Sequence, residues 1–391
     1  MIKIFTNQES ENIICNSNIA IKTSKTFNPS KNYELAEKHL NGDGVPVDFE
    51  EAEKYAQRAI RDLDPEGHKI MGDIIIKGPI IYSDGPRPSP ECPPNALNIP
   101  LSREKYEDAI ERGSVMAYES LGDMYAENCF LYFRVSKADQ EALRLYKIGA
   151  ENGVASCIRK IGDMHIRGQG VDMNIMQGVA LYEQAIEQGD KKAAEKLGDM
   201  YYSGEVIPAN IDKAMEAFAK SNSPAAIAKL GFIHYNGENG EENKSEAAKC
   251  FDKAAKLGDT RSKFILALML DKGDGINEDK QEAAKLYGEL AKTGHTSSQY
   301  NLGLMLLNGD GVSLNKQEAA NLFKSASDEG HDKSAYKLGV MMFDGDGIKQ
   351  DKESGLKLIK DSAESGNKNA KDFMKKIDKQ KSNDDKGHSL G

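Results

Sequence analysis

The sequence has no tryptophan, few aromatic residues and no excess of basic charge. Aromatic side chains make up 7% of the 391 residues, and the formal net charge is −10. Binding to nucleic-acid phosphates needs a basic face, so this charge argues against a nucleic-acid partner. No stretch approaches the roughly 20 consecutive apolar residues of a membrane-spanning helix. The composition favours a soluble helical protein that does not insert into a membrane.

Cysteines are few, and they follow no pattern. The five cysteines are odd in number and fall at no recurring position, which favours a reducing compartment. The first residues lack a basic flank followed by an apolar run, so no signal peptide is visible. The sequence therefore predicts a cytoplasmic or nuclear location.

Two consecutive stretches near the C-terminus, His295 to Gly330 and His331 to Gly366, are copies of one pattern. They share a small residue, a Leu-Gly pair, a Gly-Asp-Gly triplet and a closing Gly at the same offsets, with a period of 36 residues. Self-similarity at such a period indicates a repeat protein. About nine units follow one another between residues 31 and 366. Because stacked repeats pack only on their neighbours, this length needs no division into globular domains.

Each unit has one position, here called the slot, that holds Gly or Ala and usually follows Leu or Ile. The slot residues are Ala36, Gly72, Gly122, Gly162, Gly198, Gly231, Ala267, Gly303 and Gly339. A small residue lies five positions before the slot and a Met or Ile usually lies two after it, so these positions share one face of a first helix. A slot Gly costs about 1 kcal/mol in helix propensity. We therefore expect it to allow a close approach of a neighbouring backbone.

A second helix completes each unit. A Gly six residues after the slot, such as Gly309, suits a left-handed cap that ends the first helix. The second helix places Tyr or Phe four residues after a small residue, as at Ala319 and Phe323, and a closing Gly such as Gly330 follows. The predicted fold class is all-α: a right-handed α-solenoid of about nine helix-turn-helix repeats.

These combined positions resemble the Sel-like repeat (SLR) family, relatives of the tetratricopeptide repeat, over about residues 31–366. The resemblance implies a scaffold or adaptor that assembles a protein complex, without enzymatic activity or a cofactor. Two alternatives stay open under the same resemblance. One is a cell-wall-active or β-lactam-hydrolysing enzyme, although this chain lacks the recurrent cysteine pair of such members. The other is a secreted SLR effector.

Four segments lie outside the regular pattern. Residues 1–30 are interpreted as an N-terminal arm or cap, and residues 367–377 as a C-terminal capping helix before a disordered tail at 378–391. A proline-rich insertion at about 79–101 interrupts the second unit. It is either a docking segment, with Pro86–Pro90 as the candidate, or a tolerated loop.

No metal, cofactor or catalytic site is predicted. Asp271 and Glu282 have the spacing of a calcium-binding loop, but Gly273 and Gly275 occupy positions that need oxygen ligands. Asp recurs between the two loop glycines because turns favour it. No Cys–His set, Ser–His–Asp set or phosphate-binding loop stands out.

Helix positions three before, one after and four after the slot point away from the core. In the third to fifth units these positions are mostly charged, whereas in the last four they are mostly apolar. The candidate partner-binding residues are Phe232, Tyr235, Phe264, Leu268, Tyr300, Leu304, Leu307, Tyr336, Val340 and Phe343. An exposed apolar patch usually marks a binding site. We expect it to capture a partner peptide or helix in a concave groove, unless these side chains instead pack against the adjacent first helix.

Overall fold

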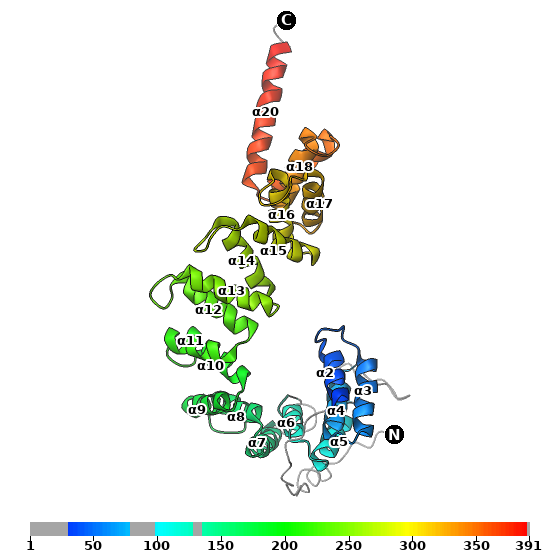
Figure 1. Cartoon of the computed structure of the whole chain (residues 1–391), viewed down its shortest axis with the longest axis vertical. Coiled ribbons are helices and arrows are strands. Elements are labelled where there is room, and N and C mark those ends of the chain that lie inside the picture. Colours follow the sequence, from blue (N-terminus) through cyan, green and yellow to red (C-terminus); the bar gives the residue numbers. More distant parts are fainter. Residues whose placement is uncertain (1–29, 79–97, 128–134, 389–391) are drawn as a thin grey trace. The chain divides into compact units, whose positions relative to one another are not determined.

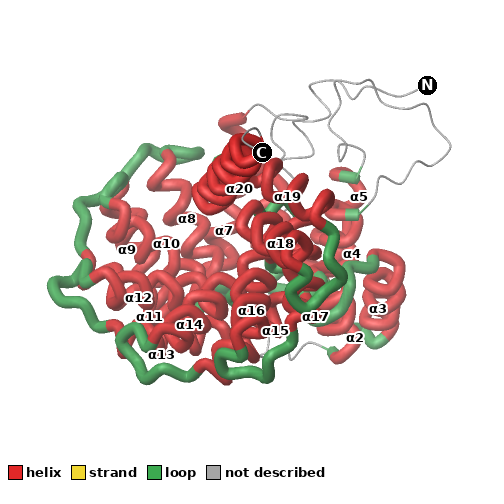
Figure 2. The backbone as a smooth tube through the Cα atoms, turned by 90° about the horizontal axis from the view of Figure 1, so that it is seen from above, coloured by secondary structure: helices red, strands yellow, loops and turns green. Residues whose placement is uncertain are grey.

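The computed structural model describes residues 30–78, 98–127 and 135–388. These residues form helices joined by loops and turns, without a strand, as Figure 2 shows. The predicted arm at 1–30, apart from Ser30, and most of the proline-rich insertion, including Pro86–Pro90, lie outside the described residues. Of that insertion, residues 98–101 are described, and a helix begins there at Ile99. The chain divides into two compact units, Met1–Ala209 (unit 1) and Asn210–Gly391 (unit 2), which are described separately.

Unit 1 is a series of helices in which each packs on the next, and first helices of successive repeats, such as α2 and α4, also contact each other. Figure 1 shows the order of these helices along the chain. They are α2 (Lys31–Asn41), α3 (Phe49–Arg61), α4 (Pro65–Lys77), α5 (Ile99–Glu111), α6 (Ala117–Glu127), α7 (Val135–Glu151), α8 (Ala155–Arg167), α9 (Ile175–Glu187) and α10 (Lys191–Ser203).

Unit 2 continues the same alternation of first and second helices. They are α11 (Ile211–Ser221), α12 (Pro224–Asn236), α13 (Lys244–Lys256), α14 (Thr260–Lys272), α15 (Lys280–Lys292), α16 (Thr296–Asn308), α17 (Lys316–Asp328), α18 (Asp332–Asp344), α19 (Lys352–Glu364) and α20 (Lys368–His388). Each helix again packs against the next one in the chain. The described residues thus confirm the predicted fold class, a helical repeat solenoid.

Capping residues explain where most of these helices begin and end. An Asp, Asn, Ser or His precedes most helices and accepts a hydrogen bond from a backbone N–H in the first turn, as Asp279 does from Glu282. The predicted Gly follows most first helices in a left-handed conformation, for example Gly309 with φ 79°. Gly78 differs, because its φ of −70° and ψ of 171° continue the chain in an extended direction.

The slot accommodates an aromatic ring more often than a backbone. A Cβ atom added to Gly303 would lie 2.6 Å from Cε1 of Phe323, which is fully buried on the second helix of the same repeat. The same close approach occurs between Gly122 and Tyr146. At Gly339 the expected backbone contact does occur: the carbonyl oxygen of Gly355 lies 2.8 Å from an added Cβ, as close as Cγ1 of Ile359. The sequence predicts close approach of a neighbouring backbone, but an aromatic ring is the nearest group at Gly72, Gly122, Gly162, Gly231 and Gly303.

The closing position of each repeat has a left-handed backbone, even where it is not glycine. Gly330 has φ 84°, Asn222 has φ 52° and Leu63 has φ 59°. Asn tolerates this region, whereas Leu is strained there. Leu63 is also 81% exposed, so packing does not compensate the strain.

Loop aspartates join successive repeats of unit 2 by ion pairs. Asp274, in the Gly-Asp-Gly loop after α14, accepts from Nζ of Lys244 at 2.9 Å, and Lys244 is the first residue of α13 in the preceding repeat. The pairing recurs between Lys280 and Asp310 and between Lys316 and Asp346. Turn preference therefore explains only part of the recurrence of Asp. Half-exposed pairs of this kind contribute about 0–1 kcal/mol each.

α20 adds a further first helix after the last complete repeat. Ala370 is fully buried, and Lys375 occupies the position where the other repeats have their slot residue. The helix reaches His388, which differs from the predicted helix at 367–377 and disordered tail at 378–391. Lys and Gln are good helix formers and no proline interrupts the segment, so a charged composition did not exclude a helix. No helix in the described part of the chain is long and apolar enough to cross a membrane.

Candidate partner-binding face

The ten candidate residues lie on the first helices of four consecutive repeats in unit 2, α12, α14, α16 and α18. Each of the ten is half-buried: none belongs to the fully buried core and none is fully exposed. The structure therefore places them on one series of helices and leaves each with partial access to solvent. Their neighbours divide eight of them into three groups, and the other two, Tyr336 and Phe343, contact α20.

In the first group, the aromatic residue three positions before the slot contacts a histidine, which caps the first helix of the following repeat. The ring centroids of Phe264 and His295 are 4.9 Å apart, and those of Tyr300 and His331 are 5.2 Å apart. Tyr300 also approaches the buried ring of Phe323 at 5.9 Å. The contacts with His295 and His331 are packing between successive repeats, which is the alternative interpretation of these aromatics.

In the second group, cations cover the aromatic faces of α12. The guanidinium of Arg261 lies 4.7 Å from the ring centroid of Phe232, and Nζ of Lys244 lies 5.2 Å from that of Tyr235. The Tyr235 hydroxyl donates to Asp274 at 2.6 Å. That hydrogen bond, with the nearby Lys244 ammonium, lowers the pKa of the Asp274 carboxyl. Phe232 and Tyr235 are therefore partly shielded from a partner.

Two members of the candidate set are covered by α20. The ring of Phe373 on α20 lies 5.6 Å from that of Phe343 and 6.4 Å from that of Tyr336, edge to face in both cases. The spacing of the repeats does not reveal this contact, because Phe373 lies beyond the last complete repeat. The C-terminal end of the predicted surface is thus occupied by this chain's own helix.

The third group is aliphatic, and we call it the aliphatic stripe: Leu268, Leu304, Leu307 and Val340. Leu268 packs at the edge of the core formed by α13 to α15, while Leu304 and Leu307 pack at the edge of the next core, around Phe323. All four are half-buried. They are the part of the candidate set without a covering charge or ring in the described structure.

The equivalent face of unit 1 is closed by paired charges. The residue after the slot is Asp123 in α6, where it accepts a hydrogen bond from the Tyr146 hydroxyl at 2.6 Å and from Nζ of Lys160 at 2.8 Å. Asp163 in α8 accepts in the same way from Tyr182 and Lys196. Each Asp therefore ties its own second helix to the first helix of the next repeat.

Arg159 completes this closure. Its side chain is only 6% exposed, donates from Nε to Asp190 at 2.9 Å, and lies 3.6 Å from carboxylate oxygens of Glu119 and Asp163. These carboxylates raise the pKa of the guanidinium against the opposing effect of burial, so the charge is retained. A buried and fully paired arginine presents little to a partner, so the mixed charge predicted for this half is largely internal.

The two kinds of face differ in the sequence at two positions that vary together: the residue after the slot and the large residue on the second helix. Three of the four repeats with Asp after the slot have Tyr on the second helix, as at Asp123 with Tyr146, because the hydroxyl needs an acceptor; the fourth has Asp199 with Phe218. Most repeats with an apolar residue there have a ring or side chain without a hydroxyl, as at Leu304 with Phe323. Leu268 with Tyr287 is an exception. A comparison of the two positions across the repeats is enough to find this signal in the sequence.

The described residues contain no group of three or more His, Cys, Asp or Glu side chains placed to hold a metal ion. Cys157 is fully buried beside Gly149, and burial raises the pKa of its thiol, so it fills the core as a small residue.

Comparison with known families gives a match over more than half of the chain. A model of the Sel1 repeat matches residues 32–62, 129–154, 155–190, 191–220, 224–259, 261–295, 296–331 and 332–367. Residues 63–128 are not matched, although Gly72 and Gly122 there receive tyrosine rings in the same manner as the other slots.

Two solved structures resemble the chain at low identity. The Sel1 repeat protein from Oxalobacter formigenes is 21% identical, with 94% of this chain and 99% of that chain covered and a TM-score of 0.49. The protective antigen c5321 of uropathogenic Escherichia coli, which displays an SLR fold, is 22% identical, with coverage of 87% and 77% and a TM-score of 0.46. At these values neither likeness carries a functional argument. No curated protein matches the chain.

Proposed function

Because this chain belongs to the Sel1 repeat family, we propose that it is a protein-interaction scaffold that captures a partner peptide or helix on the first helices of unit 2. The fold is of a kind that typically serves protein interaction. We further propose that unit 2 is the part that captures the partner and that the protein works in the cytoplasm or nucleus.

The aliphatic stripe is the observation that supports this proposal. Leu268, Leu304, Leu307 and Val340 keep partial solvent access on successive first helices, whereas the matching positions of unit 1 are closed by ion pairs. Apolar side chains on successive first helices suit the apolar face of a helix or the alternate side chains of an extended peptide. Burial of such side chains by a partner contributes about 25 cal/mol per Å².

A display library of random peptides tests the proposal with the full chain as bait. We expect enrichment of peptides rich in apolar residues, and we expect Leu304→Lys to abolish it. A lysine stem can lie along the apolar surface with its ammonium in water, so this variant should keep its fold. Its helical circular dichroism and thermal unfolding verify that.

Leu314→Lys is the matched control. Leu314 belongs to the same repeat and is 59% exposed, but it lies in the loop between α16 and α17. Enrichment should persist in this variant. Equal enrichment by Leu304→Lys and the unmodified chain would contradict capture on the stripe, as would a failure to enrich any peptide.

A further inference from the structure

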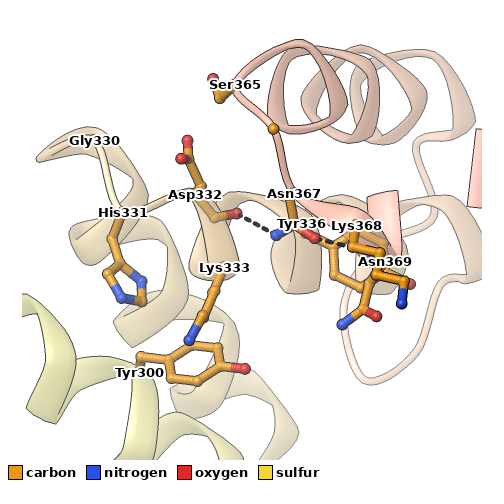
Figure 3. A pocket seen from close by; sticks show the side chains of 11 residues that line it. Tyr300, Gly330, His331, Asp332, Lys333, Tyr336, Ser365, Asn367, Lys368 and Asn369 are labelled. Atoms are coloured by element: carbon orange, nitrogen blue, oxygen red, sulfur yellow. Dashed lines mark hydrogen bonds between the residues drawn. The ribbon is translucent and has the colours of Figure 1, made fainter. Parts of the chain in front are cut away.

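A pocket opens in unit 2 next to the aliphatic stripe: two of its lining residues, Tyr300 and Tyr336, lie one helical turn before Leu304 and Val340 of the stripe. Its volume is about 680 Å³, and residues from α16, the start of α18 and the start of α20 line it. Tyr300 and Tyr336 contribute their half-buried rings. Figure 3 shows Tyr300 on one side of the pocket and Asn367, Lys368 and Asn369 on the other.

The aromatic side of the pocket is held in place by its neighbours. The Tyr300 ring is fixed between His331 and Phe323, and the Tyr336 ring packs against Phe373. Burial, followed by the charge of Lys333, holds the pKa of His331 below its ordinary range, so its ring is neutral near pH 7. This side therefore offers apolar rings and a neutral imidazole to a ligand.

Two lysines supply the charge. Lys333 and Lys368 both line the pocket, both are exposed, and neither forms an ion pair with any residue that the structure describes. By contrast, the lysines that begin α13, α15 and α17 are paired with loop aspartates, as Lys316 is with Asp346. In a chain with a net charge of −10, two unpaired ammonium groups at one pocket form a local concentration of positive charge.

One carboxylate also belongs to the pocket, and it limits the charge of a suitable ligand. Asp332 directs its carboxylate toward Ser365, while the Lys333 side chain extends toward Tyr300 (Figure 3). The backbone carbonyl of Asp332 accepts from the Ser362 hydroxyl at 3.0 Å. A doubly charged phosphate would be repelled by Asp332 more strongly than a singly charged group. A carboxylate is the anion that best fits two lysines beside one aspartate.

We propose that this pocket binds a carboxylate group of the captured peptide, with an adjacent apolar side chain of that peptide against Tyr300 and Tyr336. The inference rests on the proposed function and adds the chemistry of the partner: an acidic, partly apolar segment. The carboxylate can come from an Asp or Glu side chain or from the C-terminus of the partner. Lys333 and Lys368 attract it and set its place, which is the usual contribution of charge at an interface.

The random-peptide library, screened with free C-termini, tests the inference through the composition of the enriched peptides. The unmodified chain should enrich Asp and Glu beside apolar residues. The double variant Lys333→Glu with Lys368→Glu should lose this preference and bind the same acidic peptides at least about tenfold more weakly. Both lysines lie in the first turn of a helix, where Glu is favoured, so the fold should not suffer.

The control double variant is Lys349→Glu with Lys357→Glu. Both residues are exposed in the loop before α19 and on α19, and neither lines the pocket, so the net charge changes equally while the pocket stays intact. Acidic peptides should still bind this variant. Synthetic copies of the enriched peptides with amidated C-termini then separate the two sources: loss of binding identifies a terminal carboxylate, and retained binding identifies a side chain.

Three results would overturn the inference, and they differ in whether the proposed function survives. In the first, the enriched peptides are apolar, contain no Asp or Glu, and bind independently of Lys333 and Lys368. This result would exclude the role of the pocket but leave capture on the stripe. Equal weakening by the control double variant would show a general charge effect. An absence of any enriched peptide would end both the inference and the proposed function.

Discussion

At the scale of single residues, most positions with unusual backbone geometry have the residue that suits them, and Leu63 does not. Its φ of 59° places it in the left-handed region at the position where other repeats close with Gly or Asn. An L-residue in that region costs about 1–2 kcal/mol. Because the Leu63 side chain is 81% exposed, little packing is gained in return.

Leu63→Gly should therefore raise the stability of unit 1. Relief of the strain gives about 1–2 kcal/mol, and the greater freedom of Gly in the unfolded chain takes back about 0.5–1 kcal/mol, so the net gain is about 0–1.5 kcal/mol. A higher midpoint of thermal unfolding measures it. Leu63→Asn, which copies the residue at the equivalent position Asn222, should also raise the stability of unit 1. A lower midpoint for both variants would refute the strain at this position.

His331 should make the stability of α18 depend on pH. Its Nδ1 accepts from the backbone N–H of Ser334, which requires a neutral ring, and burial lowers its pKa below the ordinary value of about 6.5. The unfolded chain then binds more protons than the folded chain between these two pKa values. The free energy of unfolding therefore falls as the pH drops below about 6.5 and is fully present above it.

His331→Asn is the test of this dependence. Asn is a good N-cap without a titratable ring, and Asn367 already fills the same role at the next first helix. The variant loses the ring contact with Tyr300 at every pH, so we expect a constant difference in stability near neutral pH, which shifts in favour of the variant by at most about 1 kcal/mol in mild acid. Urea unfolding at several pH values gives the difference. Parallel curves for the two proteins would exclude His331 as the cause.

At the scale of elements, the slot decides how closely the two helices of a repeat approach. Gly303 admits Phe323 and Gly122 admits Tyr146, with distances from an added Cβ of 2.6 and 2.5 Å. Distances this short require the ring to move if a side chain is added. The ring on the second helix thus occupies the space that the missing side chain of the slot glycine leaves on the first helix.

Gly303→Ala should destabilise unit 2 even though Ala is the better helix former. The gain in helix propensity is about 1 kcal/mol, and the cost of overpacking the buried Phe323 ring is about 1–3 kcal/mol. Gly288→Ala on α15 is the matched control, because only one atom, at 3.9 Å, lies near its added Cβ. Thermal unfolding should move down for Gly303→Ala and up for Gly288→Ala. Equal shifts would show that the slot is not sterically tight.

The sequence predicted these elements well because the repeat displays each constraint several times. Slot, cap and closing glycines appear at fixed offsets, so spacing alone places helix pairs such as α16 and α17. Spacing could not show which atoms fill the slot, since a face of a helix does not name its neighbour. The covering of Phe343 by Phe373 was missed for the same reason. The pocket was missed because Lys333 and Lys368 occupy different offsets in their repeats.

At the scale of the whole molecule, a linear array should respond locally to damage. Repeats interact mainly with their immediate neighbours, so stability is close to a sum of repeat and interface contributions. The two units also hold their first helices together differently, by buried charge pairs around Arg159 in unit 1 and by apolar contacts around Phe323 in unit 2. A local defect therefore need not spread through the chain.

Gly303→Val should show this by hydrogen exchange. A larger side chain in the slot should displace Phe323 and reduce amide protection in the helices from α14 to α19, while protection in α2 to α9 stays unchanged. Gly162→Val, against Tyr182, should give the reverse pattern. Mass spectrometry of peptic fragments measures both. A uniform loss of protection in either variant would mean that the chain unfolds as one cooperative body.

Lys375 on α20 affects whether a further helix can dock on the end of the repeat array. In the complete repeats the slot is small and takes up a side chain from the following helix, but in α20 it carries an exposed ammonium, 3.7 Å from the equally solvated carboxylate of Asp372. A further helix that docked there would have to remove these charges from water, at a cost of several kcal/mol. Copies of the chain are thereby kept from adding end to end through α20. Lys375, at the last slot position of the repeat pattern, therefore disfavours growth of a filament through α20.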